Sequence, residues 1–253
     1  MIDDFTPIIH VLPGRTIKVW PIADVHIGAK EADMPGFSSF LKRIEQDDDS
    51  YLVICGDLLN NGIKDSLTNV YEETMPPSEQ VKLAAELLQP VADKILGCVG
   101  GNHEARSRRS VDLDPLASVM MMVGKSELYR PNMAFVRIKL RDGNVHETYN
   151  LLLAHGKTTN KKKQFQYAVE GVDAVISGHT HDGVVEKPAR LVLTQRGAVK
   201  VKHIVSVTAT SWLNYGGYSA AGLMLPKATS DPQALVLEFT RSNRQEGKLR
   251  VAW

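Results

Sequence analysis

Two histidines stand one residue apart in the stretch "AVISGHTHDG", which runs from Ala174 to Gly183. If this segment is extended, His179 and His181 point to one face, with their Cα atoms roughly 6–7 Å apart. Two imidazoles on one face suit a metal ion, because neutral imidazole is the commonest metal ligand. A polar turn at the end of a strand would produce the same pair, so these residues alone leave both interpretations open.

Four earlier apolar runs also end in side chains that can bind a metal. These residues are Asp24 and His26 in "ADVHIG", Asp57 in "CGDLLN", Asn102 and His103 in "GGNHE", and His155 in "LAHG". Ligands of open α/β sheets gather outside the carboxyl ends of the strands, so we expect these side chains to lie together. One such ending is unremarkable, but five in series indicate a shared metal-binding or catalytic site.

The segments that must position these residues alternate between strands and helices. Strands are expected in "TIKVWPIADVHIG", "YLVICGDLLNNG", "ILGCVGGNHE", "ETYNLLLAHGK" and "DAVISGHTH". Helices are expected at Met34–Glu45, at 76–94 with Ser78 capping the first turn, and at 160–171 with Gly171 as the stop. More strands follow within 183–195, 198–210, 222–228 and 234–240. This order favours a single α/β domain over residues 1–253, with two packed sheets flanked by helices.

The ordered series "DVH", "GD", "GNHE", "HG" and "GHTH" resembles the calcineurin-like metallophosphoesterase family. The resemblance covers Asp24 to His181, and "GNHE" and "GHTH" are its specific signals. It implies a four-layer αββα fold, in which a two-sheet β-sandwich flanked by helices carries a binuclear metal centre. It also implies that Asp57 bridges the metals and that His103 lies beside the leaving group. The resemblance further implies three more ligands for each metal: Asp24, His26 and His181 for one, and Asn102, His155 and His179 for the other.

The chemistry of these residues agrees with that resemblance. The set mixes carboxylate, imidazole and one amide oxygen and contains no thiolate. Such a set favours two divalent ions of Mn²⁺, with Zn²⁺, Fe or Co²⁺ as alternatives, over a Ca²⁺ or Mg²⁺ cage of oxygen ligands. Two metals roughly 3.5–4 Å apart can clamp both oxygens of an in-line displacement and acidify a bridging water to a hydroxide nucleophile.

Three residues beside the expected ligands receive supporting roles. His103 follows a ligand directly and is expected to act as general acid to the leaving oxygen or to donate a hydrogen bond to the phosphate. A third metal ligand or a packing residue is the alternative for His103. Glu104 is expected to orient His103 or a ligand. Many family members carry Asp three positions after the bridging Asp, but this chain has Asn60 there, next to Asn61, so the role of that Asp is in doubt.

Weaker candidates surround this set. Two basic clusters follow predicted site loops and could contact substrate phosphates, although solvated loops would explain both clusters. They are the arginines Arg106, Arg108 and Arg109 and the lysines Lys161 to Lys163. The segment "TSWLNYGGYS" places Trp212, Tyr215 and Tyr218 among glycines, as in a base-stacking loop or an ordinary packed turn. We interpret His10, His146 and His203 as structural or surface residues.

Composition gives little support to several other classes of protein. The net charge is +1 and the charged fraction 23%, so no global field points to nucleic acid or to a membrane. Cys55 and Cys98 lie in apolar runs and are too few for a disulfide framework, which predicts buried free thiols in a reducing compartment. The N-terminal residues lack a secretory pattern and no apolar run approaches the ~18 residues of a membrane span, so we expect a cytoplasmic protein.

Together these features predict a metallophosphoesterase that acts on a phosphodiester of nucleic acid or of a nucleotide. A phosphomonoesterase with the same centre is the nearest alternative. Protein phosphatase activity is disfavoured because the "GDxxDR" form of the second motif is absent. A non-catalytic scaffold of the same fold is the alternative from another class, and the filled ligand positions argue against it.

Overall fold

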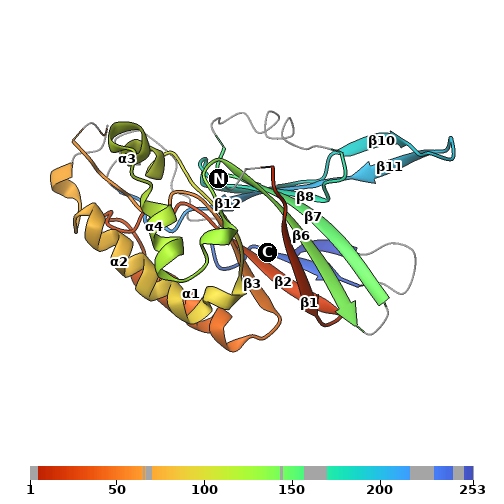
Figure 1. Ribbon diagram of the computed structural model, residues 1–253, viewed down its shortest axis with the longest axis horizontal. Coiled ribbons are helices and arrows are strands. Elements are labelled where there is room, and N and C mark those ends of the chain that lie inside the picture. Colours follow the sequence, from red (N-terminus) through yellow and green to blue (C-terminus); the bar gives the residue numbers. More distant parts are fainter. Residues whose placement is uncertain are drawn as a thin grey trace.

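Two six-stranded sheets pack together at the centre of the molecule, and helices cover one side of the pair (Figure 1). The computed structural model describes residues 5–64, 66, 70–142, 145–156, 170–216, 231–241 and 248–252. One core cluster joins apolar side chains from both sheets and from the helices. The described residues therefore share a single main core.

The first sheet has the strand order β14-β13-β2-β3-β4-β5. Its parallel part consists of β2 (Thr16–Ile22), β3 (Ser50–Cys55), β4 (Ile95–Val99) and β5 (Tyr129–Arg130). β13 (Val236–Thr240) runs antiparallel to β2, and β14 (Lys248–Ala252) runs antiparallel to β13. β4 is buried at every position, as expected for a parallel strand covered on both faces.

The second sheet has the strand order β1-β6-β7-β8-β12-β9. Its strands are β1 (Ile8–Pro13), β6 (Met133–Asp142), β7 (Val145–Ala154), β8 (Ala174–Ser177), β9 (Asp182–Glu186) and β12 (Val205–Thr210). β7, β8 and β12 run parallel to one another, so the ends of β7 and β8 meet at one edge. A separate hairpin of β10 (Ala189–Leu193) and β11 (Val199–His203) extends from this side (Figure 1).

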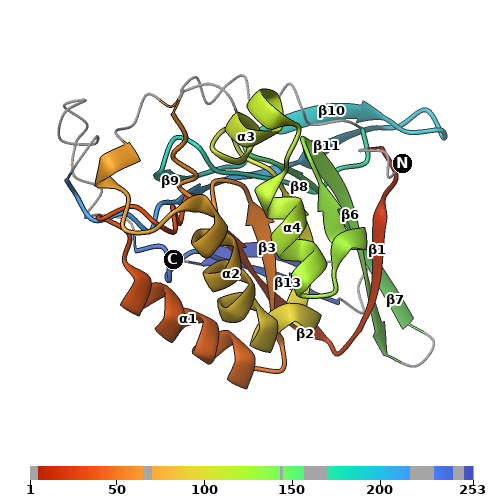
Figure 2. The ribbon, with the colours of Figure 1, turned by 60° about the vertical axis from the view of Figure 1, so that its left-hand side comes forward.

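The helices α1 (Met34–Gln46), α2 (Pro77–Leu88) and α4 (Pro115–Met122) cover the outer face of the first sheet (Figure 2). α3 (Glu104–Val111) follows the loop after β4 directly. The short helices η1 (Val70–Glu72), η2 (Gln89–Lys94) and η3 (Ser126–Leu128) complete the helical elements of the described residues. α1 begins at an Asp33 cap and buries Phe37, Phe40, Leu41 and Ile44, which share one face at helical spacing.

The predicted α/β fold, a two-sheet sandwich flanked by helices, is confirmed. The strands expected before His181 and the first helix lie where the sequence predicts them. The second predicted helix divides into α2 and η2, and Ser78 does not cap it, because its N-cap is Pro76 without a side-chain hydrogen bond. The expected helix at 160–171 lies outside the described residues except for its last two, and the expected strand at 222–228 lies wholly outside them.

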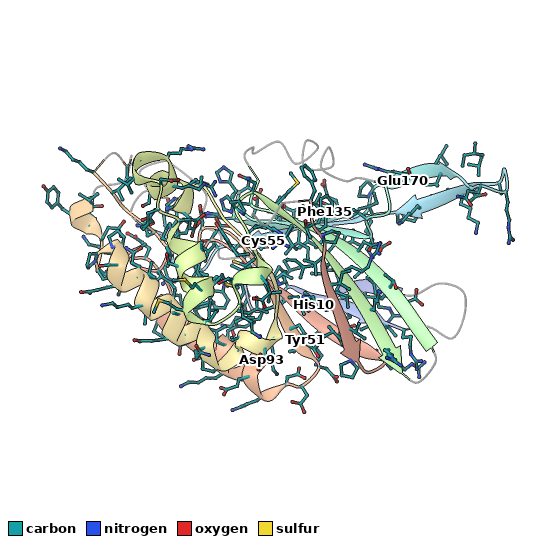
Figure 3. The ribbon with its side chains drawn as sticks, in the orientation of Figure 1. His10, Tyr51, Cys55, Asp93, Phe135 and Glu170 are labelled. Carbon is teal, nitrogen blue, oxygen red and sulfur yellow. The ribbon has the colours of Figure 1, made fainter. Side chains whose placement is uncertain are left out.

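Each of the two long strand predictions after His181 corresponds to a pair of strands, β9 with β10 and β11 with β12. Both cysteines are buried free thiols, as predicted. Sγ of Cys55, labelled in Figure 3, lies 3.7 Å from the backbone carbonyl oxygen of Ile176 in β8, so this side chain lies between the two sheets. Burial raises the pKa of both thiols, so neither behaves as a reactive thiolate. No helix among the described residues combines the length and the apolar character that a bilayer span requires.

Candidate metal centre

The predicted site residues come together at the carboxyl ends of five strands. Asp24 and His26 follow β2, Asp57 follows β3, Asn102 and His103 follow β4, His155 follows β7, and His179 and His181 follow β8. The two sheets thus bring their strand ends to one edge, as expected for ligands of an α/β fold. Asn102 and His179 are half-buried, and the other six residues are buried.

One group of donors consists of Asp24, His26 and His181, whose ligand atoms all lie within 4.8 Å of one another. Oδ1 of Asp24 lies 3.1 Å from Nε2 of His181 and 3.8 Å from Nε2 of His26. The other carboxylate oxygen, Oδ2, accepts a hydrogen bond of 2.8 Å from the backbone N–H of His179. One oxygen of Asp24 is therefore anchored while the other faces two imidazoles.

The second group consists of Asn102, His155 and His179. Oδ1 of Asn102 lies 2.9 Å from Nε2 of His155 and 2.9 Å from Nδ1 of His179. Nδ1 of His155 donates to the backbone carbonyl of Cys55 at 2.8 Å, which directs Nε2 into the site. A histidine that binds a metal usually has its other ring nitrogen oriented in this way.

Asp57 lies between these two groups. It groups with His26 and His103 on one side and with His155 and His179 on the other. Oδ2 of Asp57 lies 3.1 Å from Nε2 of His155 and 3.8 Å from Nε2 of His103, while Oδ1 accepts from the backbone N–H of His103 at 2.8 Å. Asp57 therefore lies within reach of both groups, and its bridging role stays a prediction that follows from the family resemblance.

The charges of these groups fit divalent cations. Burial would raise the pKa of Asp57, but the nearby His155 and His103 hold it well below its usual value. Burial lowers the pKa of His26 well below the usual range and also lowers the pKa of His179. Anionic carboxylates and neutral imidazoles are the forms that bind metals.

Two further observations indicate that cations belong in this site. Oδ1 of Asp24 is buried and accepts no hydrogen bond within the described part of the chain. Burial would lower the pKa of His155, but the charge of Asp57 raises it to about 10. In the metal-free protein a proton on His155 therefore supplies positive charge where carboxylate, amide and imidazole donors converge. The donor set fits two divalent ions.

The backbone of the ligand loops is strained. Seven non-glycine residues in the described ranges have positive φ, and all but Asp112 belong to this site: Asp24, His26, Asp57, Asn61, His179 and His181, with φ between 45° and 73°. This corrects the premise that His179 and His181 lie on an extended strand, because β8 ends at Ser177. The two imidazoles instead leave a left-handed loop toward different groups, His179 toward Asn102 and His181 toward Asp24.

Glu104 holds the loops after β3 and β4 together. Its buried carboxylate accepts from the backbone N–H groups of Asp57 at 3.0 Å, Leu59 at 3.0 Å and Gly101 at 2.8 Å. Gly101 also allows this close approach, because a Cβ there would overlap the backbone nitrogen and carboxylate of Asp57. Burial, followed by the charge of Asp57, raises the pKa of Glu104 to about 7. Glu104 thus fixes the backbone of Asp57, one of the residues expected to bind a metal.

His103 has both ring nitrogens engaged. Nδ1 lies 2.7 Å from the carbonyl oxygen of Asn60, which can only accept, so Nδ1 carries the proton. Nε2 lies 2.9 Å from Nη2 of Arg106, which can only donate, so Nε2 accepts. Burial lowers the pKa of His103, an effect that Asp57 opposes and Arg106 reinforces. His103 is therefore neutral in this arrangement, with its proton on Nδ1. Nε2, which faces Arg106, carries no proton and would have to gain one before His103 could act as a general acid through that nitrogen.

Asn60 contacts its neighbours through both its backbone and its side chain. Its backbone carbonyl accepts from His103, and its side-chain Nδ2 donates to Glu73 at 2.7 Å. Gln80 in α2 also donates to Glu73 and accepts from the backbone N–H of Asn61 at 2.8 Å. The sequence alone did not identify Glu73 or Gln80 as residues of the site. The available signal was Gln80 itself, a polar residue on the buried face of α2 with Ala84 and Leu88.

The three arginines have different environments. Arg106 donates to His103 and, at 3.1 Å, to the carbonyl of Asn60. Arg108 donates to Asp114 at 3.3 Å and to the carbonyl of Pro131 at 3.2 Å, so it joins α3 to neighbouring segments. Arg109 is exposed.

The remaining candidates add no side chain to the donor groups or lie outside the described residues, although the backbone N–H of Trp212 donates to the carbonyl of Asp24 at 3.1 Å. Trp212 is a core residue, packed on Phe37 and Phe40 with ring centroids 5.1 and 5.2 Å away. Tyr215 is exposed. His10 is structural, because its Nε2 pairs with the carbonyl of Leu96 at 2.7 Å, and His203 is exposed on β11. Lys161 to Lys163, Tyr218 and the side chain of His146 lie outside the described residues.

The chain matches one protein family and several solved structures at low identity. The sequence model of the calcineurin-like phosphoesterase family matches residues 17–183, and no curated protein sequence matches significantly. A conserved uncharacterized protein of Streptococcus pneumoniae TIGR4, described as a predicted phosphoesterase, is 13% identical with a TM-score of 0.37, covering 94% of this chain and 99% of that chain. Vps29 of Chaetomium thermophilum is 12% identical with a TM-score of 0.40, covering 93% and 95%. NAD nucleotidase of Haemophilus influenzae is 9% identical with a TM-score of 0.45, covering 93% and 49%.

Proposed function

Because this chain belongs to the calcineurin-like phosphoesterase family, we propose that it is a metal-dependent hydrolase that cleaves a phosphodiester of nucleic acid or of a nucleotide. The observation that carries this proposal is the position of Asp57 between two groups of donors. A carboxylate in that place suits a centre of two cations, which is the arrangement used for in-line displacement at phosphorus.

Each donor group would hold one divalent ion, with Asp57 shared between them. The first group is Asp24, His26 and His181, and the second is Asn102, His155 and His179. When bound, the two ions would supply an acidified water as the nucleophile and positive charge that offsets the charge of the phosphate. Mn²⁺ is the ion that we propose to test first, because mixed carboxylate and imidazole ligands suit it.

The other residues of the site position donors and protons. Glu104 fixes the backbone of Asp57 and of Gly101, so the shared carboxylate and the Asn102 loop keep one relative placement. His103 and Arg106 form a hydrogen-bonded pair. We propose that this pair faces the leaving oxygen. Arg106 donates to that oxygen directly, and His103 donates after Nε2 takes up a proton.

The "GNHE" and "GHTH" motifs resemble those of nuclease and phosphodiesterase branches, which supports a diester rather than a monoester as the substrate. Two unpaired, buried cysteines support our proposal that the protein works in the cytoplasm.

Hydrolysis of bis(p-nitrophenyl) phosphate by metal-stripped protein, with and without Mn²⁺, tests this proposal. We expect Mn²⁺-dependent release of p-nitrophenol, with p-nitrophenyl phosphate turned over more slowly. Faster cleavage of the monoester would refute the diester preference. Tight binding of metal without hydrolysis of either ester, with Zn²⁺ and Co²⁺ also tested, would favour a scaffold instead. Glu86→Ala on the exposed face of α2 serves as the control variant.

A further inference from the structure

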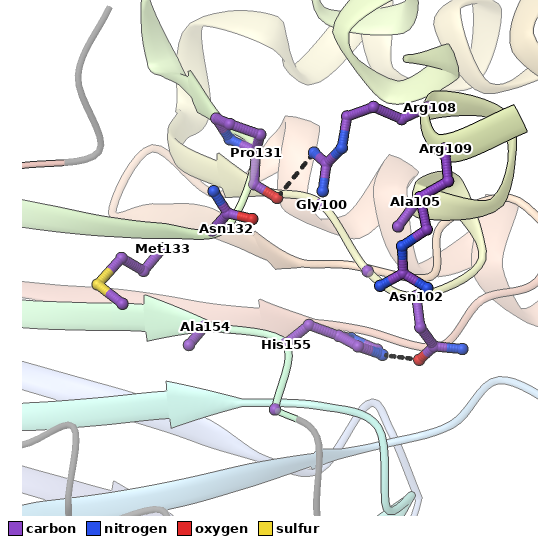
Figure 4. Close-up of a pocket in the computed structure, with 12 residues that line it drawn as sticks. Gly100, Asn102, Ala105, Arg108, Arg109, Pro131, Asn132, Met133, Ala154 and His155 are labelled. Carbon is purple, nitrogen blue, oxygen red and sulfur yellow. Dashed lines mark hydrogen bonds between the residues drawn. The ribbon is translucent and has the colours of Figure 1, made fainter. Parts of the chain in front are cut away.

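A cavity of 190 Å³ opens beside Asn102 and His155, the donor group that does not contain His26 (Figure 4). Apolar side chains form much of its wall: Ala105 from α3, Pro131 between β5 and β6, Met133 at the start of β6, and Ala154 at the end of β7. His103 and Arg106 do not line it. A phosphate held at the donors would therefore have this cavity beside it, apart from His103 and Arg106.

Arg109 supplies positive charge at the rim of this cavity, which Arg108 also lines. In Figure 4 its side chain extends from α3 toward Asn102, at the rim of the cavity. Arg109 forms no hydrogen bond or ion pair with the residues that the structure describes, whereas Arg106 and Arg108 each have named partners. The guanidinium is thus available to a phosphate oxygen at the point where the cavity meets Asn102.

The volume indicates the size of group that fits. An apolar cavity of about 150 Å³ holds one benzene ring in a well-studied engineered case. At 190 Å³, this cavity has room for one six-membered ring with small substituents and is too small for a stacked base pair. A base inside a duplex would have to leave the stack to enter it.

Resting on the proposed function, we propose that this cavity binds the unpaired, single-ring nucleobase attached to the scissile phosphate, while Arg109 contacts that phosphate. The substrate class is then a pyrimidine nucleoside phosphodiester, either a free nucleotide ester or an unpaired strand. Burying one ring against apolar side chains increases affinity by about tenfold or more. The cavity therefore confers selectivity, and the metal ligands confer the chemistry.

Two diesters with the same leaving group test the proposal. Thymidine 5′-(p-nitrophenyl) phosphate and methyl p-nitrophenyl phosphate both release p-nitrophenol, and only the first can place a base in the cavity. We expect kcat/KM to favour the thymidine ester by about tenfold or more. A ratio near one in the wild-type protein would overturn the proposal.

Two variants of the cavity wall change its size in opposite directions. Ala105→Leu fills the cavity and should bring the ratio close to one. Met133→Ala enlarges it and should shift preference from the thymidine ester to the two-ring adenosine ester, which keeps the test valid if the first variant does not fold. Arg109→Ala should lower kcat/KM for both esters by about tenfold, since a hydrogen bond to a charged group is lost, while Arg141→Ala at the other end of β6 should not.

Two further experiments identify the source of the base and test the cavity even if the protein hydrolyses neither ester. Cleavage of a single-stranded thymidine oligonucleotide but not of its duplex indicates an unpaired strand, and cleavage of the nucleotide ester alone indicates free nucleotides. If neither ester is hydrolysed, the proposed function fails. Calorimetric binding of thymidine 5′-monophosphate and of inorganic phosphate to the Mn²⁺-loaded protein then decides the cavity. Tenfold tighter binding of the nucleotide, lost in Ala105→Leu, supports the inference, and equal affinities overturn it.

Discussion

Replacing Glu104 separates two properties of its side chain, its hydrogen bonds and its buried charge. The carboxylate accepts from three buried N–H groups, those of Asp57, Leu59 and Gly101. Leaving a buried donor without a partner costs about 1–3 kcal/mol, so Glu104→Ala loses roughly 6 kcal/mol in hydrogen bonds. Against this, the rise of the Glu104 pKa from 4.5 to about 7 means that its charge destabilises the native state by about 3 kcal/mol, which the variant relieves. At pH 8 we therefore expect Glu104→Ala to be about 3 kcal/mol less stable than the wild-type protein.

The neutral isostere should behave differently. Glu104→Gln keeps one acceptor oxygen, which can serve the two N–H groups that now share Oε2, and it removes the charge. Losing one hydrogen bond destabilises Glu104→Gln, and removing the buried charge stabilises it by a similar amount. The free energy of unfolding of this variant at pH 8 should therefore lie within about 1 kcal/mol of the wild-type value. Glu86→Ala, at an exposed position of α2, is the control and should change stability by less than about 0.5 kcal/mol.

The pH dependence has a definite sign. Because the native pKa of Glu104 is raised, the metal-free native state binds a proton between pH 4.5 and about 7 that the unfolded chain has released. The contribution of Glu104 to wild-type stability is therefore largest at low pH and is lost as the pH rises through this window. The Gln variant should lack this component. Urea unfolding of the metal-free proteins at pH 5.5 and pH 8, with equal m-values, measures these differences. Equal destabilisation by Gln and Ala at pH 8 would refute the reasoning, because it would mean that the ionised carboxylate is favoured.

Three further predictions concern the proposed metals and proton transfer. Asp57→Asn should reduce bound metal from two ions to one or none by elemental analysis, since a neutral amide bridges two dications poorly; two tightly bound ions would exclude the bridging role. His103→Ala should keep both metals but lose about 10²–10⁴-fold in turnover, and loss of metal instead would identify His103 as a ligand. His155 binds a proton below its pKa of about 10, and the metal must displace that proton, so affinity should rise by about tenfold per pH unit between pH 7 and 9. Calorimetry in two buffers of different ionisation enthalpy should detect one released proton, and a pH-independent affinity would contradict the assignment.

The part of the site that the sequence predicts consists of residues at the ends of apolar runs. Asp57 and His155 could be placed because a buried strand appears in the sequence as an apolar run, and the residue at which that run ends is easy to locate. The supporting residues could not be placed in this way. Glu73 reaches the site from the segment before α2, and its partner Asn60 comes from another loop, so only the folded chain shows the contact.

Two of the elements that were not predicted, α3 and β6, have different explanations. α3 has the sequence "EARSRRSV", which lacks an apolar face, and it is held instead by contacts of Glu104, Ala105 and Ser107 with the site loops. Its helical form could not be inferred from periodicity. β6 is another case, because "MAFVRIKLRD" alternates apolar and polar residues, and its buried positions Ala134, Val136, Ile138 and Leu140 follow that alternation. That signal was present in the sequence.

The strained backbone of the ligand loops explains why side-chain spacing alone could not give the geometry of the site. A non-glycine residue in the left-handed region costs roughly 1–2 kcal/mol, and Asp24, His26, Asp57, His179 and His181 all have this conformation. Glycine would avoid the cost but has no side chain to bind a metal. The conformation is kept by backbone hydrogen bonds between loops, such as Asp24 N–H to the Gly56 carbonyl at 3.1 Å and His26 N–H to the Asp57 carbonyl at 3.1 Å. An extended chain would direct His179 and His181 to one common point, whereas the left-handed turns send them to separate donor groups, which is what a centre of two ions requires.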